Sequence, residues 1–341
     1  MSGRLRIAAA AGLLALLALL ALAVLLPQAA AAGWLVIFVF AGLVPLGALL
    51  ILMVGRLTGG LWVESLSPVL RPAALLLPLL CLIALPLALG LWQIYPWLQG
   101  HPEVREPVRA LFLNLPLFAV RAVVALAGWA ILSRLIPQGR GGQVLAGLGL
   151  LFHAVIMTLV SVDWLLSIDP TFMPSAFAAD LIIKQILAAL AFCALIGPEP
   201  DDGKVPHDLG GLLLAATLGS AYFVLMQYMI IWYGDLPETS RWYLVRGDRL
   251  GTTLILLALL FGALLPLPAL LFERVRHHRV GLRWVGGSVL FGLFCWLCWV
   301  VTPAFGMEAL GAAVLGLVAL AGLTAGGWIW HSRDREARYG R

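Results

Sequence analysis

His153-Ala-Val-Ile-Met-Thr-Leu-Val-Ser-Val-Asp163-Trp164-Leu-Leu-Ser-Ile-Asp169-Pro170 is the stretch that decides the fold. It closes an apolar segment, near residues 143–167, that is long enough to cross a membrane, since roughly 20 apolar residues span a hydrocarbon core as a helix. The segment contains the ionisable His153 and Asp163, and Asp169-Pro170 stops the helix. Ionisable groups in lipid are costly. We therefore predict a membrane helix whose charges have partners or a function.

The rest of the chain has the same apolar character. Hydrophobic residues make up 62% of the 341 positions and charged residues 11%, which is typical of a multi-span membrane protein and excludes a soluble enzyme. The spacing predicts an all-α fold with about ten transmembrane helices in a single integral membrane domain, 1–341. These helices are expected near 5–26, 33–54, 72–92, 109–132, 143–167, 174–197, 210–233, 250–272, 283–302 and 307–330.

The first apolar segment has two interpretations. Arg4 and Arg6 precede an apolar run from Ile7 to Leu26, and the alanines at 29–32 resemble a signal-peptide cleavage region. The run is longer than the 7 to 15 residues usual in a signal peptide, which favours a retained helix. Cleavage would leave nine helices.

The basic residues predict the orientation. With the N-terminus inside, 15 of the 22 Lys and Arg residues are cytoplasmic, 5 are external and 2 lie in mid-span. The positive-inside rule then places both termini in the cytoplasm. The net charge of +5 reflects this orientation and contact with anionic lipid, and we expect no nucleic-acid binding. An acidic cytoplasmic loop, 197–209, separates the sixth and seventh helices and is interpreted as a solvated linker.

Arg121 lies about midway through its apolar segment. A lone central Arg costs roughly 3 kcal/mol on insertion scales, so we expect a buried acceptor. Asp163 and Asp180 are the nearest candidates by depth. The alternative to a functional role is an ion pair that only fixes helix packing.

Asp180 and Lys184 are four residues apart, so they share a helix face and can pair in the favourable order. Together with Arg121 and Asp163 they would form a charge-balanced polar seam. Such seams in membranes mark proton relays, ion routes or polar-headed ligand sites, although two complete ion pairs would need no function.

His153 and Asp163 are ten residues apart, or about 15 Å along a helix. Both could line one cavity at different depths, and a column of His153, Thr158, Ser161 and Asp163 is suited to passing protons. The alternative is a lone His that bonds a backbone carbonyl.

Metal and redox sites have little support. Cys295-Trp-Leu-Cys298 has the CxxC spacing, yet it lies inside an apolar segment, where thiols pack as small hydrophobic groups. His153 is the only mid-span His, so this chain alone cannot build a bis-His haem site. We expect no covalently bound or metal cofactor.

Two blocks resemble a known family: Ser161-Val-Asp163-Trp164-Leu-Leu-Ser167-Ile-Asp169-Pro170 and Gln227-Tyr-Met-Ile-Ile-Trp232-Tyr233-Gly-Asp-Leu-Pro237-Glu238-Thr239. They are similar to the second quinone-binding-type membrane subunit of alternative complex III, the bacterial quinol:cytochrome c oxidoreductase. That subunit is related to the polysulfide reductase membrane subunit family. The chain departs from the family after Pro170, where Thr171-Phe172-Met173-Pro174-Ser175 lacks the family's His and Trp, which indicates a diverged or shortened relative.

The resemblance implies two four-helix bundles plus peripheral helices, in a bacterial cytoplasmic (inner) membrane. It implies partner subunits that carry iron-sulfur clusters and c-type haems, a related membrane subunit, and quinone or quinol as the ligand. Under this hypothesis His153, Asp163, Asp180, Lys184 and Arg121 form a proton path or a quinone pocket in an oxidoreductase complex.

Two other functions remain open from the sequence. A structural subunit would use its charges only to lock helices and its external residues to dock partners, namely Trp232, Tyr233, Glu238, Arg241, Trp242 and Tyr243. A proton-coupled secondary transporter would bind its ion at Asp163 or Asp180.

Overall fold

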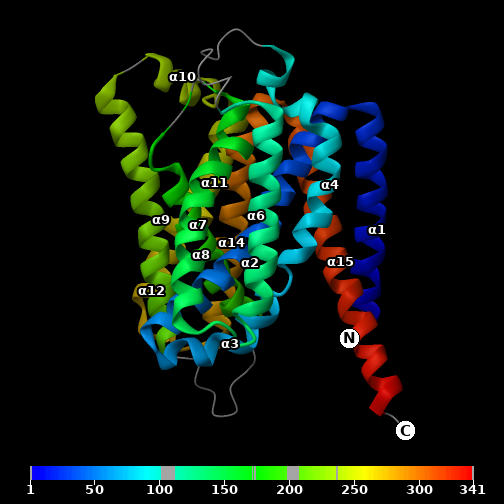
Figure 1. Ribbon diagram of the computed structural model, residues 1–341, viewed down its shortest axis with the longest axis vertical. Coiled ribbons are helices and arrows are strands. Elements are labelled where there is room, and N and C mark those ends of the chain that lie inside the picture. The colour runs from blue at the N-terminus through cyan, green and yellow to red at the C-terminus, as the bar shows by residue number, and fades with distance from the viewer. Residues whose placement is uncertain are drawn as a thin grey trace.

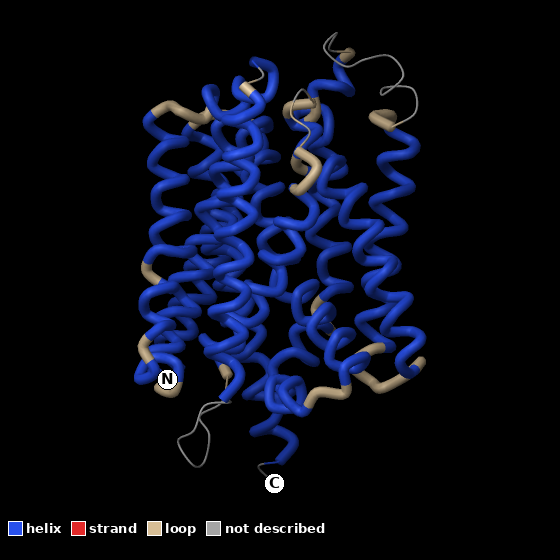
Figure 2. Tube along the Cα trace, turned by 90° about the vertical axis from the view of Figure 1, so that its left-hand side faces the viewer, coloured by secondary structure: helices blue, strands red, loops and turns tan. Residues whose placement is uncertain are grey.

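The computed structural model describes residues 2–100, 112–170, 172, 174–197, 207–235 and 237–339, and no strand occurs within these ranges. Ten helices in them are long and apolar enough to cross a membrane, as predicted. Figure 2 shows helices that run nearly parallel, joined by short loops, with both termini at one end. The opposite end, where α10 lies (Figure 1), is called the α10 end below. Most of the acidic loop 197–209 falls outside the described residues.

Each predicted segment overlaps one membrane span of the structure, and several spans begin or end some residues beyond the predicted bounds. The bounds of the helices are α1 Ser2–Leu25, α2 Pro27–Thr58, α3 Leu61–Ala74, α4 Leu77–Ile94, α6 Leu115–Leu135, α7 Gly142–Trp164, α8 Phe177–Ile196, α9 His207–Gly234, α11 Arg249–Leu259, α12 Pro266–Leu271, α14 Arg279–Val301 and α15 Met307–Tyr339. Between and beside them lie η1 Pro96–Gln99, η2 Leu166–Ile168, α10 Pro237–Val245, η3 Leu260–Leu264, α13 Glu273–Arg276 and η4 Thr302–Ala304. A π-helical turn, η3, joins α11 and α12 into one span.

Helix ends have local causes. The side chain of Asn114 accepts a hydrogen bond from the Leu117 backbone N–H and so caps the start of α6, and Asp248 caps α11 in the same way through Gly251. Gly59 ends α2 in the left-handed conformation, at a φ of 65°, which glycine adopts without a steric penalty.

Two helices lie largely outside the predicted membrane segments. The segment 61–74 contains Pro68 and Pro72, yet its apolar side chains Val63, Leu66 and Leu70 recur at helical spacing and are buried. α3 is therefore amphipathic, and α3 and α4 together form a span, 62–94, longer than the predicted 72–92. The connection between the predicted segments 210–233 and 250–272 contains the short helix α10.

The contacts between helices define two four-helix bundles. In the first bundle α2, α4, α6 and α7 contact each other in a ring, and in the second α8, α9, α11–α12 and α14 do the same. α2 and α8 pack closely across the boundary between them. α1 and α15 lie side by side at the periphery, where Figure 1 shows them as the blue and red helices. The predicted arrangement of two bundles plus peripheral helices matches these contacts.

Candidate functional site

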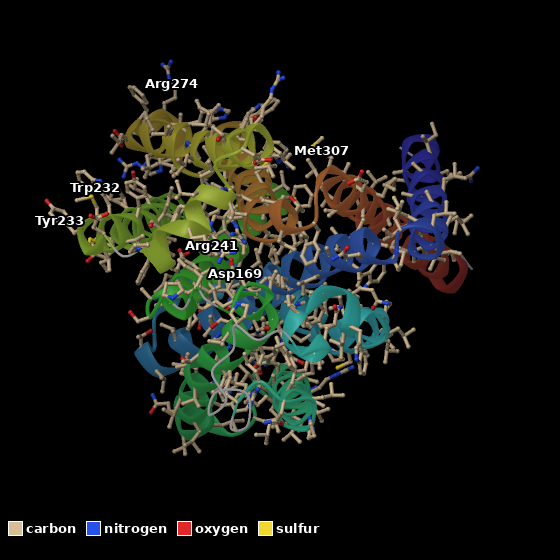
Figure 3. All side chains as sticks on the ribbon, turned by 90° about the horizontal axis from the view of Figure 1, so that it is seen from above. Asp169, Trp232, Tyr233, Arg241, Arg274 and Met307 are labelled. Atoms are coloured by element: carbon tan, nitrogen blue, oxygen red, sulfur yellow. The ribbon has the colours of Figure 1, made fainter. Side chains whose placement is uncertain are left out.

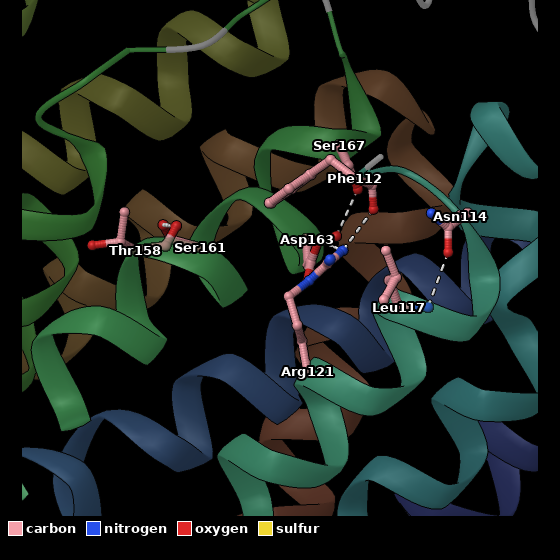
Figure 4. A network of polar contacts seen from close by, with 8 residues as sticks. All are labelled: Phe112, Asn114, Leu117, Arg121, Thr158, Ser161, Asp163 and Ser167. Atoms are coloured by element: carbon pink, nitrogen blue, oxygen red, sulfur yellow. Dashed lines mark hydrogen bonds and ion pairs between the residues drawn. The ribbon is translucent and has the colours of Figure 1, made fainter. Parts of the chain in front are cut away.

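Arg121 pairs with Asp163, one of the two acceptors that the sequence allowed. The guanidinium of Arg121, on α6, makes two hydrogen bonds to the Asp163 carboxylate on α7, with Nε–Oδ2 2.6 Å and Nη2–Oδ1 2.8 Å (Figure 4). The Asp163 side chain is fully buried, and that of Arg121 is 13% exposed. Bidentate, charge-assisted bonds of this kind are among the strongest polar contacts in proteins.

The surroundings of this pair use its remaining hydrogen-bonding capacity. Arg121 Nη2 also donates to the Phe112 carbonyl at 2.8 Å, and the guanidinium lies 4.2 Å from the centre of the Phe112 ring. Nearby, at the end of α4, the Tyr95 hydroxyl donates to the Trp164 carbonyl at 3.1 Å. Burial and the Asp163 carboxylate raise the pKa of Tyr95 above its usual range, so its phenol keeps its proton.

His153 belongs to a separate hydrogen-bonded chain of neutral side chains. The Trp129 indole N–H donates to His153 Nδ1 at 3.1 Å, and His153 Nε2 lies 2.9 Å from Gln185 Oε1. Because Nδ1 accepts the indole hydrogen, Nε2 carries the imidazole hydrogen and donates it to Gln185. Gln185 in turn donates to the Met157 sulfur at 3.4 Å. The ring is thus held by two side chains rather than by the backbone carbonyl of the alternative interpretation.

The proposed column along α7 does not form as a continuous path. The Thr158 side chain is exposed and its hydroxyl donates to the Ala154 carbonyl, while Ser161 donates to the Thr158 carbonyl. Figure 4 shows both residues pointing away from the Arg121–Asp163 pair. The prediction failed at these two positions because hydroxyls in helices readily satisfy themselves on the preceding turn.

Asp180 and Lys184 form the expected i,i+4 ion pair on α8, and both side chains are almost fully buried. The Lys184 ammonium also lies 4.3 Å from the centre of the Trp296 ring on α14. This pair therefore faces the second bundle, whereas the Arg121–Asp163 pair lies in the first. Among the described residues no ion pair or hydrogen bond joins the two pairs directly, so the four charges form two balanced sites instead of one cluster.

Helix α8 contributes polar side chains to both bundles. Consecutive residues of a helix point about 100° apart, so Lys184 faces Trp296 in the second bundle while Gln185 reaches His153 in the first. Sequence reasoning had omitted Gln185, although a buried amide beside Lys184 in an apolar segment was a usable signal.

A cavity of about 610 Å³ opens beside Asp180 in the second bundle. Most of its wall is apolar and aromatic, with side chains from α8, α9, α10, α11–α12 and α14. Trp242, Trp296 and Trp299 line it, and the Phe172 ring stacks on Trp242 at 4.2 Å between ring centres. Its polar lining gathers Asp180, Gln227, Tyr228, Tyr243, Arg246 and Thr252. In the first bundle, by contrast, the cavity between Trp129 and Gln185 measures only about 20 Å³.

Arg246 is a lining residue that the sequence did not single out. Arg246 is only 3% exposed, and its guanidinium lies 3.7 Å from the centre of the Trp242 ring. It donates to the backbone carbonyls of Trp242 and Val300, and its Nε has no hydrogen-bond partner. Burial lowers the pKa of Arg246 to about 10, against the opposing effect of Asp169, so it remains a cation at neutral pH.

The aromatic residues suggested for partner docking separate into two groups. Trp232 and Tyr233 are 62% and 77% exposed, and Figure 3 shows them at the periphery of the molecule. Trp242 is buried and lines the cavity together with Tyr243. Only the first pair is available for contact with a partner or lipid.

No family model matches the chain, and a comparison with curated proteins finds no match. The resemblance of the two sequence blocks to the alternative complex III subunit therefore stays a prediction. Both blocks end near the α10 end, the first after α7 and the second after α9.

Proposed function

We propose that this multi-pass membrane protein is a subunit of a respiratory quinol-oxidising complex in a bacterial cytoplasmic membrane, with both termini in the cytoplasm. Its partners would be the subunits that carry iron-sulfur clusters and c-type haems, together with a related membrane subunit. The chain itself would contribute residues that receive protons and contact quinol.

One observation carries this proposal: the buried Asp180 carboxylate, paired with Lys184, borders a cavity of ligand size. A carboxylate in a membrane is expensive to maintain and usually marks an ion path or a ligand site. At such a cavity an acid can accept a proton from a hydroxyl group. The neighbouring ammonium can stabilise the anion that develops.

A purely structural role is the second candidate, because the charges are complete without a ligand. Arg121 and Asp163 satisfy each other, Asp180 and Lys184 do the same, and both nitrogens of His153 have partners. Under this role the ion pairs would fix helix packing and contribute nothing to turnover.

The first test is purification of the tagged protein from its native membrane in mild detergent, followed by haem spectra and identification of co-purifying subunits. Co-purified c-type haem and iron-sulfur subunits support the proposal. A colourless, solitary protein would refute it and favour a proton-coupled transporter.

The second test compares quinol:cytochrome c turnover in complexes with two variants. Asp180→Asn/Lys184→Gln removes both charges of the pair at once, and we expect a loss of turnover of tenfold or more. Asp235→Asn is the matched control, because Asp235 is exposed at the same end and its φ of 43° suits asparagine equally well. Full turnover of an assembled double variant would leave the structural role as the better account.

A further inference from the structure

The cavity of the second bundle is elongated along the helices. On α11–α12 its lining runs from Thr252 to Leu267. Fifteen residues at 1.5 Å each correspond to roughly 22 Å of depth. Arg246 and Tyr243 lie at the α10 end of this length, and the lining beyond Ile255 on this span is apolar. The cavity is therefore amphipathic, with polar groups at one end only.

The cavity also opens sideways, toward the surroundings of the bundle. Leu225 and Tyr228 on α9 and Leu264 on η3 line it, yet each is more than half exposed. In a membrane these side chains face lipid. The opening between α9 and α11–α12 thus gives access to a molecule that is dissolved in the bilayer.

The polar end offers both donors and an acceptor. The Nε of the buried Arg246 lacks a partner, and an unsatisfied buried donor costs about 1–3 kcal/mol. Burial and the nearby Asp180 raise the pKa of Tyr243 to about 12, so its phenol remains a donor. The Asp180 carboxylate is the acceptor. The rings of Phe172, Trp242, Trp296 and Trp299 line the same cavity as these polar groups. Aromatic rings pack well against a flat aromatic ligand.

We propose that this cavity binds a membrane-soluble molecule with a planar, oxygen-bearing head and an apolar tail, the chemistry of an isoprenoid quinol. The head lies at the α10 end, where an oxygen accepts a hydrogen bond from Arg246. The tail follows α9 and α11–α12 and leaves toward lipid between them. The volume of about 610 Å³ is within the usual range for ligand sites. The identification of the head as a quinol rests on the proposed function, whereas the site itself rests on the cavity.

The test is a direct binding measurement on the purified full chain in detergent, with decylubiquinone as the probe. Quinones quench nearby indoles, and three tryptophans line the cavity, so saturable quenching of tryptophan fluorescence gives the dissociation constant. Arg246→Gln should weaken binding about tenfold or more. Ala263→Phe should abolish binding by filling the middle of the cavity. Because this variant leaves the hydrogen bonds of Arg246 intact, it tests the site even if Arg246→Gln fails to fold.

Matched controls separate binding in the cavity from general effects. Arg249 lies three positions after Arg246 and is exposed. Leu265 lies two positions after Ala263 and is 49% exposed. Neither residue lines the cavity. Arg249→Gln and Leu265→Phe should therefore leave binding unchanged. Quenching that persists in Ala263→Phe would overturn the proposal. Quenching that excess phosphatidylglycerol reverses would also overturn it, in favour of a phospholipid site.

The binding result is independent of the partner subunits. Cavity-dependent binding in a protein that purifies alone would support the site and refute the respiratory role. Co-purified haem subunits with no cavity-dependent binding would refute only the site.

Discussion

Removing the charge of Asp163 should leave the Arg121 guanidinium without its carboxylate inside the membrane-spanning region. Two unit charges about 4 Å apart attract by about 4 kcal/mol at an effective dielectric constant of 20, and breaking a buried pair costs about 3–5 kcal/mol. In Asp163→Asn, Arg121 keeps the Phe112 carbonyl and is 13% exposed, so we expect a loss near 3 kcal/mol. Arg121→Gln strands a fully buried carboxylate, so its loss should be near 5 kcal/mol.

The double variant Arg121→Gln/Asp163→Asn contains no stranded charge. Replacing a whole buried pair by neutral groups is often close to neutral, so the double variant should lose about 1 kcal/mol, far less than the two single losses together. The free energy of unfolding can be measured by SDS titration in mixed micelles, followed by circular dichroism. Single losses that simply add, with coupling below about 1 kcal/mol, would refute the pairing.

The same variants separate the two candidate roles when turnover of the assembled complex is measured. A structural pair requires only that no charge be stranded, so the double variant should regain turnover along with stability. If Asp163 handles a proton, the double variant should be stable and remain slow. Unchanged turnover in a normally assembled Asp163→Asn complex would exclude the proton role.

Two further predictions concern packing and the His153 chain, and both use the same unfolding measurement. Gly47 on α2 packs directly against the Gln185 carbonyl on α8, so Gly47→Ala should destabilise by about 1–3 kcal/mol through overpacking. Gly147 on α7 has open space around it, and equal losses for Gly47→Ala and Gly147→Ala would contradict the close α2–α8 contact. Trp129→Phe removes the donor to His153 Nδ1 and should cost about 1–3 kcal/mol, whereas Trp92→Phe, at a residue that is 49% exposed, should change little. A Trp129→Phe variant as stable as the wild type would show that the indole hydrogen bond contributes nothing.

The sequence predicted the short-range features of the site better than its long-range ones. The Asp180–Lys184 pair follows from i,i+4 spacing alone, and the structure contains it. Arg121 had two candidate acceptors, and only the packing of α6 against α7 selected Asp163. The chain of Trp129, His153 and Gln185 joins residues 24 to 32 positions apart, so no local pattern could reveal it.

The sequence by itself determined that the chain crosses a membrane about ten times, because the length of an apolar segment decides whether it partitions into lipid. It did not determine which helices are central. The first two spans have nearly equal mean hydropathy, 2.7 and 2.8, yet 17% of the first and 83% of the second is buried. Lipid is as apolar as a leucine side chain, so hydropathy does not distinguish a helix surface that faces lipid from one that faces another helix. Tertiary packing alone therefore decided that α8 lies between the bundles, that Arg246 is buried, and that a lipid-facing cavity forms beside Asp180.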